Sequence, residues 1–150
     1  AGRYDRVRAG YHTGVGMTVI ICIGLALLVT PLRHFWMSLF VSKEYEPELA
    51  AEVILLGAGM LAVTPPCYWV LGLIHAALNT MAGAGATMFS MVSMVAMMLL
   101  RVAIAWGLIH FAGMDQRGIW AAFVLSWIVT LCFVQVRYCS GSWMKKALRK

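Results

Sequence analysis

The chain has 150 residues, of which 62% are hydrophobic and only 12% are charged. Soluble domains carry about 25% charged residues, so this chain has too little charge to cover the surface of one. Its net charge of +6 is concentrated near the two ends of the chain, which indicates membrane topology rather than nucleic-acid binding. We therefore expect a lipid bilayer as a partner and no nucleic acid.

The first uncharged run, at residues 10–32, predicts a membrane-spanning helix, because about 20 apolar residues cross the hydrocarbon core. The run is too long for a signal peptide, and no small-residue cleavage site follows it. Pro31 and the aromatic and basic segment 33–36 predict an interface anchor, after which the helix continues toward Phe40 along the membrane surface. The chain begins with Ala1 rather than Met, so we expect that part of the protein precedes it.

A second run without charged residues extends from 53 to 100, which is long enough for two crossings. The first of them is predicted at 48–78, with Pro47 in its first helical turn. The second is predicted at 88–111. A small-residue turn at 82–87 joins the two crossings into a hairpin.

Pro65 and Pro66 lie near the middle of the 48–78 span. Each proline removes a backbone hydrogen bond and clashes with the preceding turn, so the helix is expected to kink or break there. Freed carbonyls in a membrane are tolerated only against protein or a water-filled cavity. The kink therefore predicts either a cavity-lining helix or a packed structural bend.

A fourth span is predicted at 118–136, followed by a basic tail at 137–150. Because Lys and Arg residues concentrate on the cytoplasmic side, both termini are expected in the cytoplasm. The 82–87 turn is then cytoplasmic, and the loop at 114–117 lies outside. The chain is thus predicted to be an all-α polytopic membrane protein with four transmembrane helices.

Other patterns in the spans predict packing rather than chemistry. The four cysteines lack metal-ligand spacing, so neither a disulfide framework nor a metal site is expected. Two pairs of small residues, Gly10 with Gly14 and Ala103 with Gly107, predict close approach of helices. A methionine stripe runs along the third span, and such stripes are typical of packing, lipid contact or adaptable binding surfaces. The stripe comprises Met88, Met91, Met94 and Met98, with Met97 alongside.

Five short motifs resemble, in order, those of the multidrug and toxin extrusion (MATE) transporters. Segment 1–8 is similar to the small-Gly-basic loop after the eighth span of that family, and 78–87 to the Gly-rich turn after the tenth. Segment 100–103 (Leu-Arg-Val-Ala) resembles a Leu-Arg-Ile-Pro sequence of the eleventh span, with Ala103 in place of the proline. Segment 118–120 (Gly-Ile-Trp) is similar to the start of the twelfth span, and 137–145 to the basic tail.

This resemblance implies that the chain forms spans nine to twelve of a twelve-span transporter, within its C-terminal six-helix lobe. It implies efflux of organic, cationic drugs or metabolites by sodium or proton antiport across a bacterial inner membrane, without a cofactor and without enzyme activity. Antiport needs a carboxylate inside the membrane, and every acidic residue of this chain lies in a loop or at a span end. The coupling ion is therefore expected to bind in the missing spans, which include the whole N-terminal lobe.

Five residues are candidates for lining the substrate cavity. Arg101 is the charge at mid-depth of the third span, where a buried arginine is costly and functional by default. Tyr68 and Trp69 follow the proline pair and offer aromatic faces to planar cations. His75 and Asn79 lie further along the same span, toward its cytoplasmic end.

Two other interpretations stay open at this point. A lipid-linked oligosaccharide flippase of the same superfamily would share the architecture but would line its cavity with several basic residues. A small four-helix structural membrane subunit would be a complete protein rather than a fragment. A membrane-bound enzyme is disfavoured, because no nucleophile–base pair or metal cluster shares a depth in the spans.

Overall fold

The computed structural model describes residues 4–41 and 46–141, and in this part of the chain every regular element is a helix. Their order is α1 (Tyr4–Val29), α2 (Arg33–Phe40), α3 (Pro47–Val63), the 3₁₀ helix η1 (Pro65–Cys67), α4 (Tyr68–Gly83), α5 (Thr87–Ala112) and α6 (Gln116–Cys139). The first three residues and most of the basic tail, from 142 onward, lie outside the described residues.

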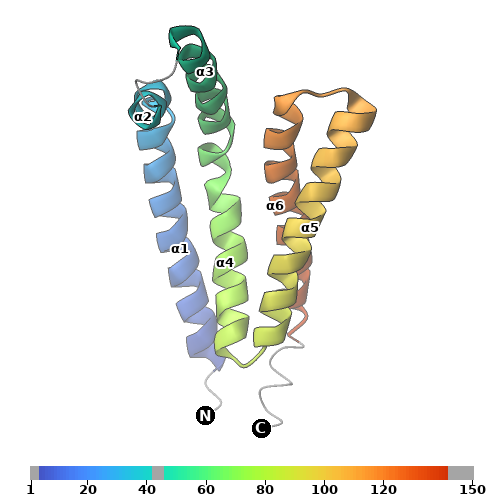
Figure 1. Cartoon of the computed structure of the whole chain (residues 1–150). Coiled ribbons are helices and arrows are strands. Elements are labelled where there is room, and N and C mark those ends of the chain that lie inside the picture. The colour runs from blue at the N-terminus through green and yellow to red at the C-terminus, as the bar shows by residue number, and fades with distance from the viewer. Residues whose placement is uncertain (1–3, 42–45, 142–150) are drawn as a thin grey trace.

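Four stretches of the described residues are long and apolar enough to cross a membrane. They are Ala9–Val29, Pro47–Gly83, Thr87–Ala112 and Gln116–Cys139. This confirms the predicted fold class, an all-α polytopic membrane protein. Figure 1 shows the spans alternating in direction, so that the start of α1, the α4–α5 turn and the end of α6 lie at one end of the bundle.

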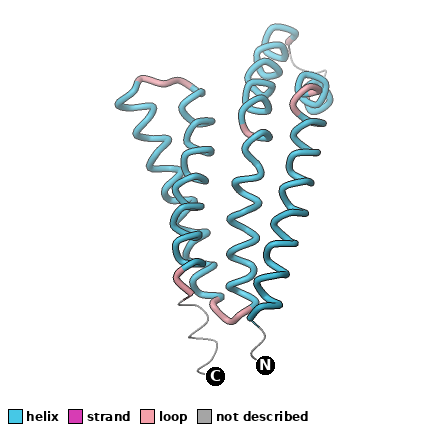
Figure 2. The backbone as a smooth tube through the Cα atoms, turned by 180° about the vertical axis from the view of Figure 1, so that it is seen from behind, coloured by secondary structure: helices cyan, strands magenta, loops and turns pink. Residues whose placement is uncertain are grey.

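Helix α4 lies at the centre of the bundle. It packs against α1 on one side and against α5 and α6 on the other, and the view from behind shows the same arrangement (Figure 2). Its buried face carries Val70, Ile74, Ala77, Leu78 and Met81. Because α1, α5 and α6 all pack on α4, this helix connects the first span to the α5–α6 hairpin.

The second span is longer than the sequence predicts. It was expected to end at residue 78, but α4 continues to Gly83, and only residues 84–86 connect it to α5. The Thr80 hydroxyl donates a hydrogen bond to the Ala76 carbonyl at 2.7 Å, so this polar residue stays helical instead of starting the turn. The fourth span also extends further, because Arg137 belongs to the last turn of α6 rather than to the tail.

Gly85 lies in the turn between α4 and α5 and has a φ of +96°, a backbone conformation that residues with a Cβ rarely adopt. We expect Gly85→Ala to destabilise the protein by about 1–2 kcal/mol. Gly83→Ala is the matched control, because Gly83 is helical and a Cβ there would meet no atom within 4 Å. Thermal unfolding of the complete protein in detergent measures both variants, and equal melting temperatures for the two would contradict the expected strain.

The predicted kink takes the form of a break between α3 and α4. Helix α3 ends at Val63, and the 3₁₀ turn Pro65–Cys67 precedes α4. Thr64 at this junction is buried, and its hydroxyl donates at 2.9 Å to the Met60 carbonyl, which also accepts the Thr64 backbone N–H. The break packs against α1 rather than standing free in the bundle.

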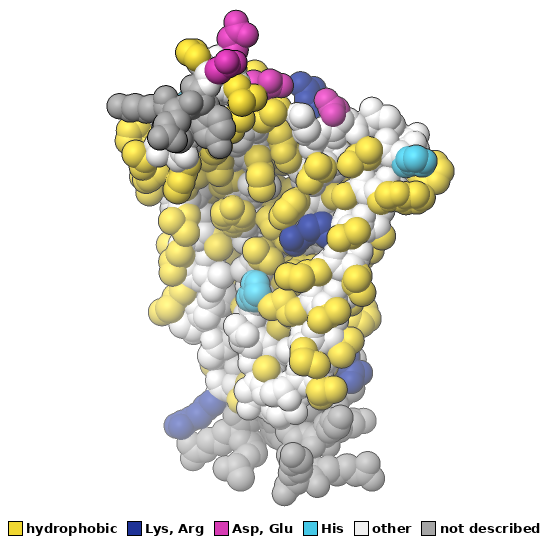
Figure 3. Space-filling view, viewed as in Figure 1, with side chains coloured by type: hydrophobic (Ala, Val, Ile, Leu, Met, Phe, Trp, Pro, Cys, Tyr) yellow, Lys and Arg dark blue, Asp and Glu magenta, His cyan; other side chains and the backbone are white. Residues whose placement is uncertain are grey.

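The outer faces of the helices are apolar and exposed. Among the side chains of α1 that the structure describes, Tyr11 alone is buried, and it stacks on Tyr138 of α6 with ring centroids 4.3 Å apart. Figure 3 shows apolar side chains over most of one face, with acidic side chains at one end. Such a surface suits contact with lipid or with further spans.

Candidate functional site

The candidate site centres on Arg101, near the middle of α5. Its Nε donates a hydrogen bond to the Ser126 hydroxyl at 3.4 Å, and its guanidinium carbon lies 4.2 Å from the centre of the Phe123 ring. The ring of Trp127 lies 6.0 Å from the same carbon. The charge predicted at mid-depth is therefore held by cation–π contacts and one hydroxyl on α6, an arrangement that lowers the cost of a cation in a dry environment.

Helix geometry brings the three partners of Arg101 together. Phe123, Ser126 and Trp127 are spaced by three and four residues, so they share one face of α6. Ser126 is fully buried, and its hydroxyl donates in turn to the Phe123 carbonyl at 2.8 Å. Ser126 accepts from only one of the five N–H donors of a guanidinium, which leaves Arg101 with donors for another group.

Tyr68 adds the third helix to this cluster. As the first residue of α4 directly after the 3₁₀ turn, it meets Trp127 edge-to-face, with ring centroids 6.0 Å apart. The proline break thus places an aromatic side chain against α6. We call Tyr68, Arg101, Phe123, Ser126 and Trp127 the arginine cluster.

The other three candidate residues lie away from the arginine cluster. Trp69 is 43% exposed and lines a groove against α1, on a different side of α4 from Tyr68. At about 1.5 Å of rise per residue, half-buried His75 lies about 10 Å beyond Tyr68 along the helix, and exposed Asn79 about 16 Å. The structure therefore brings two of the five predicted residues, Tyr68 and Arg101, to one place.

The α6 members of the arginine cluster were not predicted from the sequence, although a usable signal exists. Arg101 and Trp127 are equally far along the chain from Met114, in the loop between α5 and α6. Residues equidistant from the loop of an antiparallel helical hairpin lie at the same level. Pairing the two spans around that loop would have placed Trp127 beside Arg101.

The described residues hold no carboxylate at the level of Arg101. Glu46, Glu48, Glu52 and Asp115 are all exposed, and they lie near the start of α3 or at the α5–α6 loop. Within 4–41 and 46–141, no group of three His, Cys, Asp or Glu side chains is placed to hold a metal ion.

Two cavities flank the arginine cluster. One of about 330 Å³ lies between α5 and α6, where Leu100, Thr130 and Phe133 are among its walls. Another of about 390 Å³ lies between α3 and the start of α6, beside Asp115 and Arg117. There the ring of Trp120 packs directly on Gly59, where an added Cβ would come within 2.5 Å of it.

Comparison with known proteins decides the family. The family model MatE matches residues 1–106, which include Tyr68 and Arg101. The chain belongs to the MatE family. This confirms the resemblance to MATE transporters predicted from the five motifs, and it makes the chain a multi-pass membrane protein of a transporter family.

A relative supports the same family. The chain is similar to the "probable multidrug resistance protein YoeA" of Bacillus subtilis (strain 168), with 22% identity over 151 residues. That alignment covers 100% of this chain but 31% of the relative, so the MatE chain spans about a third of the length of the relative it matches. No solved structure matches the chain. The assignment to spans nine to twelve stays a prediction.

Proposed function

We propose that the chain is spans nine to twelve of a MatE efflux transporter, within the C-terminal six-helix lobe of a twelve-span protein. The transporter exports organic compounds in exchange for sodium ions or protons. The arginine cluster carries this proposal, because it joins three helices around a charge and aromatic rings at mid-membrane depth. Family membership and the multidrug resistance relative support the same function.

The proposed substrate is a planar, amphipathic organic cation. Aromatic faces attract such molecules by stacking and by cation–π contact, and Tyr68 is half-buried at the edge of the cluster, where a ligand can reach it. Arg101 already occupies the Phe123 ring, so it sets the position of the cluster and repels a second cation placed directly on it. The substrate therefore stacks on the Tyr68 side.

The charges that drive transport lie elsewhere in this proposal. A coupling ion needs a carboxylate in the membrane, and the described residues supply none at that depth. The ion site and the counter-charge of a cationic substrate then belong to spans outside this chain, including the N-terminal lobe. The protein acts as a transporter and not as an enzyme, in a bacterial inner membrane with both ends of this segment in the cytoplasm.

The experiment is ethidium efflux by the complete protein in a bacterial strain that lacks its own exporters. Fluorescence is expected to fall faster in cells that produce the protein. Collapse of the gradient that drives transport, which is that of protons or that of sodium ions, is expected to abolish this difference. Tyr68→Ala is expected to slow efflux several-fold. Replacing an aromatic side chain on which a ligand ring of the size of a nucleobase stacks costs about 1–3 kcal/mol of binding free energy. Trp106→Ala is the aromatic control, because Trp106 lies on α5 outside the arginine cluster and is 61% exposed.

Two results would contradict the proposal. Efflux that ignores both gradients would exclude antiport. Normal efflux by Tyr68→Ala, at equal membrane abundance, would remove the arginine cluster from the substrate path.

A further inference from the structure

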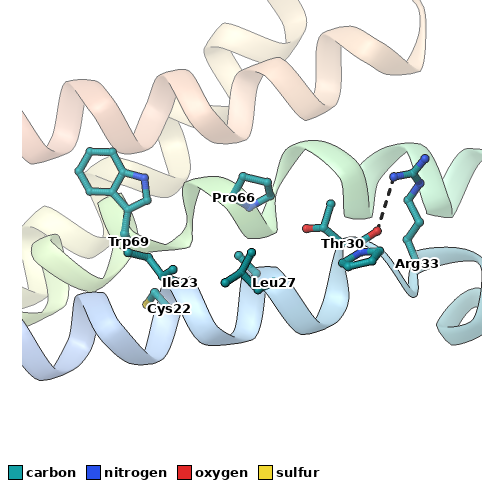
Figure 4. A pocket seen from close by; sticks show the side chains of 9 residues that line it. Cys22, Ile23, Leu27, Thr30, Arg33, Pro66 and Trp69 are labelled. Atoms are coloured by element: carbon teal, nitrogen blue, oxygen red, sulfur yellow. Dashed lines mark hydrogen bonds between the residues drawn. The ribbon is translucent and has the colours of Figure 1, made fainter.

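A groove of about 450 Å³ runs between α1 and the proline break, on the side of α4 away from the arginine cluster. One wall consists of side chains of α1, including Cys22 and Leu27, and the other includes Pro66 and Trp69 (Figure 4). The walls are almost entirely apolar. The groove lies where η1 interrupts the second span, with Pro66 of η1 and Trp69 of α4 facing α1.

The groove has one polar end, at Arg33. This arginine is the first residue of α2, just beyond the last turn of the first span, and its Nη1 donates to the Thr30 carbonyl at 3.5 Å (Figure 4). That bond uses one of the five N–H donors of the guanidinium. The Thr30 hydroxyl beside it is buried and has no hydrogen-bond partner among the described residues.

The shape and charge of the groove match one class of molecule. Its apolar length lies along the hydrocarbon-depth part of α1, where Leu27 is 71% exposed, and its cationic end lies where that span stops. A volume of this size lies within the range of about 300–1,000 Å³ typical of sites for small organic ligands. A guanidinium binds phosphate oxygens through two parallel hydrogen bonds, so the cationic end of the groove suits an anionic head group.

We propose that this groove is a binding site for an anionic phospholipid, with one acyl chain between α1 and the proline break and the phosphate at Arg33. The site is separate from the arginine cluster and does not depend on the transported substrate. A bound lipid fills the groove beside η1 and adds to the contacts that already join α1 to the broken helix.

The test is photo-crosslinking of the complete protein in nanodiscs, with phosphatidylglycerol that carries a photoreactive acyl chain. Peptide mass spectrometry is expected to find the lipid on residues 22–30. The same chain on phosphatidylcholine is expected to label this segment about fivefold less, since one basic residue at the membrane surface favours anionic lipid by about that factor.

Two pairs of variants separate the acyl and head-group contacts. Leu27→Trp fills the groove, whereas Leu28→Trp changes a neighbouring exposed leucine of α1 that does not line it. Arg33→Gln removes the phosphate partner, whereas Arg117→Gln removes an exposed charge from the first turn of α6. Labelling of 22–30 is expected to drop several-fold in the first member of each pair and to stay at the wild-type level in the second.

Several outcomes would overturn the proposal. Labelling elsewhere but not on 22–30 would mean that another span of the complete protein covers the groove. Equal labelling of 22–30 by the two lipids would mean that α1 contacts bulk lipid without a specific site. Equal labelling of all four variants would mean the same.

Discussion

Arg101→Gln is expected to lower the ethidium efflux rate of the complete protein by at least about tenfold, since a desolvated cation–π contact is worth about 2 kcal/mol. The substitution removes the charge from the face of Phe123, 4.2 Å away, and the donor to Ser126. The aromatic rings that Arg101 orients would then lose their common partner. The expected loss is in transport at equal membrane abundance.

Arg101→Lys separates charge from geometry. A lysine keeps a cation near Phe123, but it lacks the flat guanidinium that stacks on the ring and the Nε that reaches Ser126. We therefore expect an efflux rate between those of the wild type and Arg101→Gln. Arg117→Gln is the control, since that arginine is exposed beside the α5–α6 loop. If Arg101→Gln transports ethidium normally, the arginine only fastens α5 to α6.

The spans were predictable because membrane insertion leaves a coarse and robust signal. Long apolar runs placed all four spans, and the predicted bounds differ most from the observed helices at the start of α1 and at the end of the second span. The predicted end of the second span, at 78, excludes the polar residues Asn79 and Thr80, which the structure includes in α4. A hydroxyl that bonds its own helix removes this conflict, and the turn depends instead on Gly85 with its positive φ.

Which face of each helix is buried was not predictable in the same way. The methionine stripe gave no reliable guide, because Met88, Met91 and Met98 are exposed, whereas Met97 beside the stripe is in the core. A helix that is apolar all round has no amphipathic signal, so periodicity cannot assign its inner face. The exposed stripe remains free for lipid or for spans outside this chain.

The glycines of the small-residue pairs predicted to allow close helix approach have no close neighbour among the described residues. A Cβ at Gly10, Gly14 or Gly107 would meet nothing within 4 Å. The close contacts of the described residues lie at Gly57 with Met37, Gly59 with Trp120 and Gly72 with Thr18. The spacing of small residues permits close packing, but the helix that faces them decides whether it occurs. Which helix faces them is known only from the tertiary structure.

Trp127→Ala is expected to lower the free energy of unfolding by about 3 kcal/mol, a typical cost for truncating a buried aromatic residue. Trp127 is only 3% exposed and touches a side chain from each neighbouring helix, Tyr68 of α4 and Arg101 of α5. Helices in a membrane associate through packing of this kind rather than through the hydrophobic effect. Trp106→Ala, on the same hairpin but 61% exposed, is the matched control and is expected to change stability little.

Trp127→Phe tests whether a smaller aromatic ring at this position is enough to stabilise the contact between the three helices. The phenyl ring keeps an aromatic face for Arg101 and Tyr68, and it removes an indole N–H that is buried without a partner among the described residues. Removing a buried donor that has no partner offsets part of the free energy lost with the smaller ring. We therefore expect Trp127→Phe to lower the free energy of unfolding by about 1 kcal/mol. Circular dichroism during thermal unfolding in detergent gives all three values. If Trp127→Ala has the melting temperature of the wild type, other contacts hold the three helices together, and the arginine cluster is a site without a structural role.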